Sequence, residues 1–119
     1  MKYTLIFLTL SLFLTACSRQ DTKLTKQITG TWTRHGTGNQ AVFVYAPNGS
    51  FSITETYADT PGRTNLCAGT WRIQDRVLIM TFTTVPEQCR AHVGTVARYQ
   101  ISHLDGHQLL TDEEFHLSR

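Results

Sequence analysis

Several features that would assign a fold or a reaction are missing from this chain of 119 residues. Its longest apolar stretch runs from Tyr3 to Leu14, which is shorter than the ~20 residues that a membrane-spanning helix needs. The chain has three cysteines but no Cys-x-x-Cys pair, which argues against a thioredoxin-like role. No segment of helical length keeps a 3.6-residue apolar period, which argues against a helical fold.

Charge is also scarce and evenly spread. Charged residues make up 17% of the chain, the formal net charge is +2, and no run of five like charges occurs. Nucleic-acid-binding proteins gather positive charge on one face, so we expect no nucleic-acid partner. No Ser-His-Asp or Cys-His arrangement can be assembled from the sequence. We therefore expect no catalytic residues, no cofactor and no enzymatic activity.

A few polar residues are weak candidates for a site. His103 and His107 flank a turn at Asp105, where they could hold a metal together with a carboxylate. Exposed loop histidines are the commoner case, so no metal ligand is predicted. Glu55 falls on the apolar register of its strand. If it were buried, its pKa would be raised and it would mark a site, whereas a strand end open to water would make it an ordinary carboxylate.

The N-terminus carries an export signal. Lys2 precedes the apolar stretch, whose length is typical of a secretory signal peptide. Leu14-Thr15-Ala16-Cys17 then resembles the lipobox of bacterial lipoproteins. This resemblance implies cleavage before Cys17, diacylglycerol on its sulfur and a fatty acyl group such as palmitate on its new amino terminus. Ser18 resembles the residue of lipoproteins sorted to the outer membrane. We therefore expect a lipid anchor in that membrane, on its periplasmic face.

This interpretation divides the chain into a signal peptide (1–16), a lipidated cysteine with a tether (17–27) and one domain (28–119). The polar tether has two interpretations. It is either a flexible linker or one to two turns of helix, which would place Leu24 and Ile28 on one face.

Cys67 and Cys89 form an even pair of cysteines in a compartment expected to be oxidising. Such a pair is predicted to form a disulfide bond. The bond would close a loop of 22 residues along the chain. In the chain-entropy model, such a loop closure stabilises the folded state by roughly 3 kcal/mol. Two free thiols are the alternative.

From Ile28 onward the apolar period changes to two, which is typical of strands with one buried and one wet face. Turn sequences such as Ala46-Pro47-Asn48-Gly49 and Gln74-Asp75-Arg76 separate these segments. About eight short strands with short connections predict an all-β, antiparallel up-and-down barrel. The expected strands include Gln40–Tyr45, Ser50–Tyr57, Gly69–Ile73, Val77–Phe82, Val96–His103, Gln108–Thr111 and Phe115–Ser118.

One short motif, Gly-Thr-Trp, occurs twice. Gly30-Thr31-Trp32 and Gly69-Thr70-Trp71 each open a strand, and glycine there allows a bend or bulge. With the turn at Ala46–Gly49 and the late Leu104-Asp105-Gly106, they resemble small bacterial lipocalin-like lipoproteins. The resemblance implies a small barrel that binds an apolar molecule. Lipocalins usually pack a late arginine against the first-strand tryptophan, and Arg98 or Arg119 would serve here.

A bound ligand would sit in a barrel mouth lined by Trp32, Trp71 and Tyr99, because these side chains combine a large apolar area with a polar group. Eight short strands leave room for packed side chains or for one small ligand. A filled barrel would favour a protein-binding module, such as an envelope-complex component or a periplasmic inhibitor or immunity protein. The side chains expected to point inward are Trp32, Phe51, Ile53, Trp71, Ile73, Leu78, Met80, Phe82, Tyr99 and Ile101.

Overall fold

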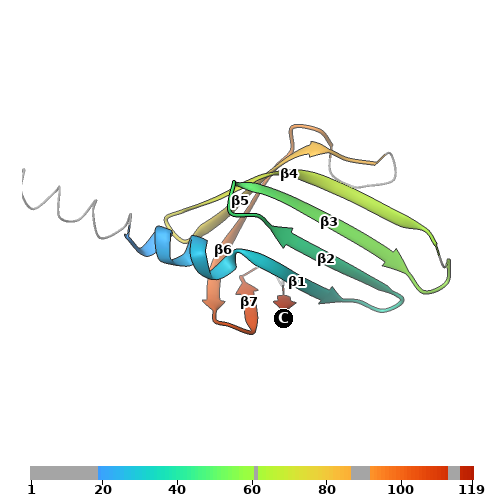
Figure 1. Cartoon of the computed structure of the whole chain (residues 1–119), viewed down its shortest axis with the longest axis horizontal. Coiled ribbons are helices and arrows are strands. Elements are labelled where there is room, and N and C mark those ends of the chain that lie inside the picture. The colour runs from blue at the N-terminus through green and yellow to red at the C-terminus, as the bar shows by residue number, and fades with distance from the viewer. Residues whose placement is uncertain (1–18, 61, 87–91, 113–115) are drawn as a thin grey trace, which may run out of the picture.

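A computed structural model describes residues 19–60, 62–86, 92–112 and 116–119. Its eight strands follow one another around a closed antiparallel barrel, in which β8 pairs back onto β1 (Figure 1). The predicted all-β, up-and-down barrel is confirmed. The strands are β1 (Gly30–His35), β2 (Asn39–Tyr45), β3 (Ser50–Tyr57), β4 (Thr64–Gln74), β5 (Val77–Thr84), β6 (Val96–Leu104), β7 (Gln108–Thr111) and β8 (His116–Ser118).

The tight turns form where the sequence carries turn residues. Asp75 and Arg76 join β4 to β5 with positive φ angles of 52° and 62°, the backbone of a two-residue type I′ turn. In the turn between β2 and β3, the side-chain oxygen of Asn48 accepts a hydrogen bond from the N–H of Ser50 at 3.0 Å. Gly49 in the same turn has a φ of 89°. Both hairpins predicted from the sequence are confirmed.

Strand β4 is longer than the sequence indicates. It begins at Thr64 rather than at Gly69, and it carries Cys67 at a buried position. Two of the added residues, Asn65 and Ala68, are of types depleted in strands, but pairing with β3 continues as far as Thr56 and Thr64, and such tertiary pairing outweighs propensity. Cys89 lies outside the described residues, so the disulfide stays a prediction.

Gly69 marks an irregularity in this part of the barrel. The pairing of β4 with β5 shifts register between Ala68 and Gly69, as the glycine predicted. A Cβ atom on Gly69 would collide with the carbonyl oxygen of Thr81 and lie 2.9 Å from the ring of Phe51. The strands approach so closely here that a side chain has no room.

The centre of the barrel is packed with side chains. Nine of the ten residues expected to point inward are buried, while Tyr99 is half-buried against the same cluster. Further core residues come from β2 and from the short strands β7 and β8. In β2 both faces carry apolar residues, so the sequence does not show which side chains point inward. The large side chains that are less than 2% exposed are Ile28, Trp32, Tyr45, Leu78, Met80, Ile101, Leu109 and Leu117.

One helix precedes the barrel. Residues 19–28 are helical, so the helical interpretation of the tether is the one that the structure has. Leu24 and Ile28 are 7% and 0% exposed and join the core. Figure 1 shows the helix at one end of the barrel, which we call the closed end. Among the described residues, no helix has the length and apolar character needed to cross a membrane. Cys17 lies outside them, so its lipidation stays a prediction.

Candidate binding site at the open rim

The two tryptophans expected to line a ligand pocket are packed in the structure. Trp32 is 0% exposed, and its indole N–H donates to the carbonyl oxygen of Ile28 at 2.7 Å. Trp71 is 6% exposed, and its indole N–H donates to the carbonyl oxygen of Ala46 at 3.1 Å. Its ring meets Tyr45 edge to face, with 5.4 Å between the ring centroids. Tyr99 is half-buried on β6.

Arg119 occupies the position that the lipocalin resemblance gives to a late arginine. Its guanidinium lies over the ring of Trp32 at 4.0 Å from the centroid. It also donates to the carbonyl oxygens of Gln27 at 2.9 Å, Thr29 at 3.1 Å and Gly106 at 3.0 Å. The other candidate, Arg98, is exposed on β6. Arg119 therefore ties the end of the helix to the barrel.

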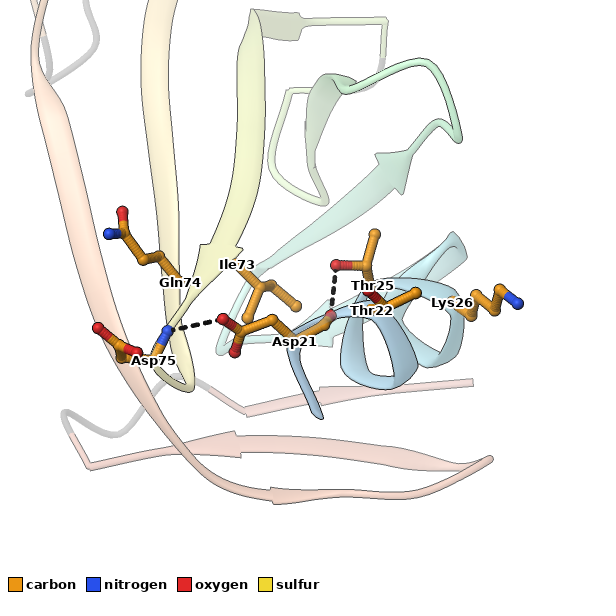
Figure 2. Close-up of a pocket in the computed structure, with 7 residues that line it drawn as sticks. All are labelled: Asp21, Thr22, Thr25, Lys26, Ile73, Gln74 and Asp75. Carbon is orange, nitrogen blue, oxygen red and sulfur yellow. Dashed lines mark hydrogen bonds between the residues drawn. The ribbon is translucent and has the colours of Figure 1, made fainter. Parts of the chain in front are cut away.

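The start of the helix is held by a second contact. The carboxylate of Asp21 accepts hydrogen bonds from the backbone N–H groups of Asp75 at 3.1 Å and Arg76 at 3.3 Å, both in the turn between β4 and β5. Figure 2 shows the first of these bonds beside the bond from the Thr25 hydroxyl to the Asp21 carbonyl, 2.7 Å long. The positive φ angles of the turn present two neighbouring N–H groups to one carboxylate. A hollow between helix and turn is lined by Asp21, Thr22, Thr25, Lys26, Ile73, Gln74 and Asp75.

The opposite end of the barrel, the open rim, has a polar inner face. There β1 to β4 extend well past β7 and β8 (Figure 1), which have four and three residues. Arg34 follows Trp32 by two residues and so shares its face. The strand registers align Arg34 with Ala41, Ala41 with Glu55, and Glu55 with Asn65. The apolar barrel interior therefore gives way to a layer of polar side chains.

We call Arg34, Glu55, Tyr57 and Asn65 the rim cluster, because consecutive contacts join them. The Arg34 guanidinium lies 3.3 Å from one carboxylate oxygen of Glu55. The Tyr57 hydroxyl donates to the other Glu55 oxygen at 2.9 Å and accepts from the Asn65 side-chain amide at 3.0 Å. Donation to the Glu55 carboxylate raises the pKa of Tyr57 above its usual value of 10.0. The cluster is thus an ordered polar network at the mouth of the barrel.

Arg34 and the neighbouring Arg63 each lie over an aromatic ring. The guanidinium carbon of Arg63 lies 4.8 Å from the ring centroid of Tyr57, and that of Arg34 lies 5.6 Å from the centroid of Phe43. The side chains of Arg34 and Glu55 are 40% and 28% exposed. Glu55 therefore stands at a strand end open to water, the second of the two situations considered for it. An adjoining hollow is lined by His35, Gly36, Gly38, Asn39, Gln40, Thr56, Tyr57 and Ala58.

The histidine pair around Asp105 forms a capped turn. His103 contacts the Asp105 carboxylate at 2.8 Å, and the same carboxylate accepts from the backbone N–H groups of His107 at 2.7 Å and Gln108 at 2.8 Å. The His103 hydrogen bond is the main reason why the pKa of Asp105 falls to about 2. Within the described ranges, no group of three His, Cys, Asp or Glu residues is arranged to hold a metal ion.

The rim cluster offers hydrogen bonding and charge on a concave surface, which suits recognition of a polar group. Sequence reasoning singles out Glu55 but not Arg34, Tyr57 or Asn65. Two-residue alternation along β1 could have placed Arg34 on the same face as Trp32. Asn65 belongs to a segment that is not predicted as strand. The chain matches no protein-family model, no curated protein and no solved structure.

Proposed function

We propose that this chain is a non-enzymatic binding protein that recognises another protein at its open rim. We further propose that it is exported and held in the outer membrane by lipid on Cys17, facing the periplasm. The observation that carries the proposal is the contrast along the barrel axis. The barrel is packed at its centre and covered by a helix at one end, while polar side chains on the inner face of β1 to β4 meet solvent at the other.

A protein partner fits this arrangement better than the small apolar ligand expected from the resemblance. Both indole N–H groups are bonded to backbone carbonyl oxygens, so neither is available to orient a guest. The aromatic side chains that would line a pocket belong to the packed core. The rim carries charge and hydrogen-bonding groups, which are typical of the polar parts of protein interfaces.

Site-specific photo-crosslinking in the producing bacterium tests the proposal. A photoreactive amino acid replaces Thr37 or Thr56 at the rim, or Lys23 or Gln74 at the closed end as matched controls; all four positions are exposed. We expect a discrete protein adduct from the rim positions and none from the controls. Adducts that are absent from the rim, or equal at both ends, would contradict the proposal. Saturable binding of a fluorescent fatty acid by the purified protein would favour the apolar-ligand function instead.

The anchor has its own test. Cys17→Ala should abolish lipidation and leave a precursor or a soluble periplasmic form, because lipid attachment needs the cysteine sulfur. Metabolic labelling with a fatty-acid analogue measures the modification. Wild-type protein that stays unlabelled would show that the anchor prediction is wrong.

A further inference from the structure

The Arg34 guanidinium is the part of the rim cluster with spare hydrogen-bonding capacity. Resting on the proposed function, we propose that Arg34 binds the carboxylate of an acidic side chain presented by the partner protein. The partner segment would then carry a glutamate or aspartate that enters the barrel mouth. Glu55, Tyr57 and Phe43 would hold the arginine in position for it.

Arg34 is held by its neighbours, but its hydrogen-bond donors are not all used. A guanidinium has five N–H donors in a planar fork, and the Nη2 group of Arg34 makes the contact to Glu55. That contact is 3.3 Å long, which exceeds the ~2.7–2.9 Å typical of a strong charge-assisted bond. The side chain is 40% exposed. The Phe43 ring, 5.6 Å from the guanidinium carbon, supplies no hydrogen-bond acceptor in the ring plane, so the partly exposed guanidinium keeps donors for a further acceptor.

Within the rim cluster and its neighbour Arg63, two arginines stand against one carboxylate, that of Glu55. The Glu55 carboxylate is already paired with one cation, because its two oxygens accept hydrogen bonds from Arg34 and from Tyr57. The Tyr57 hydroxyl donates to Glu55 and accepts from Asn65. Arg63, in the connection before β4, lies over the Tyr57 ring and adds a second cation next to the cluster. A further cation would be repelled by these two arginines, whereas a carboxylate would be attracted to them.

The expected geometry is specific to arginine. A carboxylate can accept two parallel N–H bonds from a guanidinium, and lysine cannot reproduce that fork. Arg34→Lys keeps the positive charge but loses the planar fork. It therefore distinguishes a carboxylate bound by two parallel hydrogen bonds from one bound by charge attraction alone. Arg98→Lys is the matched control, because Arg98 is exposed on the outer face of β6.

The test is a titration followed by nuclear magnetic resonance of the arginine side-chain N–H groups, on the purified full chain in detergent micelles. The probe is an N-acetylated, C-amidated Gly-Glu-Glu-Gly peptide. We expect a saturable shift of the Arg34 signal, no shift with the Gly-Gln-Gln-Gly peptide, and an affinity at least about tenfold weaker in Arg34→Lys. Arg98→Lys should bind the glutamate peptide like the wild type.

Three results would overturn the inference. They are an Arg34 signal that does not respond to the glutamate peptide, equal binding of the glutamine peptide, and binding that needs a free C-terminal carboxylate on a peptide without acidic side chains. Protein crosslinks at Thr37 and Thr56 together with any of these results would leave the proposed function standing and remove Arg34 as its carboxylate site. Loss of the rim crosslinks would remove the proposed function itself.

Discussion

The closed end and the open rim of this barrel use polar side chains in opposite ways. At the closed end, Trp32, Arg119 and Asp21 all bond to backbone carbonyl or N–H groups. At the open rim, Arg34, Glu55, Tyr57 and Asn65 bond to one another. Backbone partners cannot leave without unfolding a segment, whereas side-chain partners can exchange. The contacts of the closed end therefore hold backbone segments together, whereas those of the rim can be exchanged without moving the backbone.

Burial follows the same division. Trp32 is 0% exposed, while the side chains of Arg34 and Glu55 are 40% and 28% exposed. Exposed ion pairs contribute little to stability because water and salt screen them. Substitutions at the closed end should therefore lower the free energy of unfolding, and substitutions at the rim should change local properties while leaving that energy nearly intact.

The largest effect is expected at Trp32. Trp32→Ala removes a fully buried indole, its bond to Ile28 and the surface on which Arg119 stacks. Comparable truncations cost about 3–5 kcal/mol. Urea unfolding followed by circular dichroism measures the loss. A cost below about 1 kcal/mol would show that Trp32 does not hold the closed end, and the comparison between the two ends would fail.

Arg119→Ala should have the next largest effect. It removes three hydrogen bonds to backbone carbonyl oxygens and the cation–π contact with Trp32. Because the residue is exposed, we expect a loss of about 1–3 kcal/mol. Arg98→Ala is the control and should stay within about 0.5 kcal/mol of the wild type. Equal unfolding midpoints for the two variants would mean that Arg119 has no special role in tying the helix down.

Asp21→Ala should have a smaller and more local effect. The lost bonds to Asp75 and Arg76 should cost about 1 kcal/mol. The sharper readout is hydrogen exchange of those two amides, which should speed up while the amides of β2 and β3 keep their protection. Lys23→Ala, exposed on the same helix, serves as the control. Unchanged exchange at Asp75 and Arg76 would contradict the contact.

The smallest change in stability is expected from Glu55→Gln, at the rim. Loss of its exposed ion pair with Arg34 should cost less than about 1 kcal/mol. The pKa of Tyr57 should fall toward 10.0, because the carboxylate that accepts the hydrogen bond from its hydroxyl is gone. A raised folded-state pKa favours the folded protein below pH 10, and this contribution fades as pH rises through the folded value. Resonance titration of the Tyr57 ring measures the shift, and an unchanged pKa would rule out the hydrogen bond.

The sequence predicts the barrel better than it predicts either end. Two-residue alternation and turn residues are local, so β2, β3 and β7 are found closely. The helix over residues 19–28 depends on contacts far along the chain, since Asp21 meets a turn 54 residues away and Arg119 reaches back 92 residues. Short helices are unstable without such packing. Choosing Arg119 over Arg98, or pairing Arg34 with Glu55, needs the strand register, which single-sequence patterns do not fix.

The bond between Asp21 and the β4–β5 turn also fixes which end of the barrel would lie near the lipid proposed on Cys17. Asp21 is four residues after Cys17, a length of chain that spans at most about 14 Å when fully extended. A lipid on Cys17 would therefore keep the closed end close to the bilayer, with little slack for the barrel to turn over. The open rim would then face away from the membrane, where a partner protein could reach it.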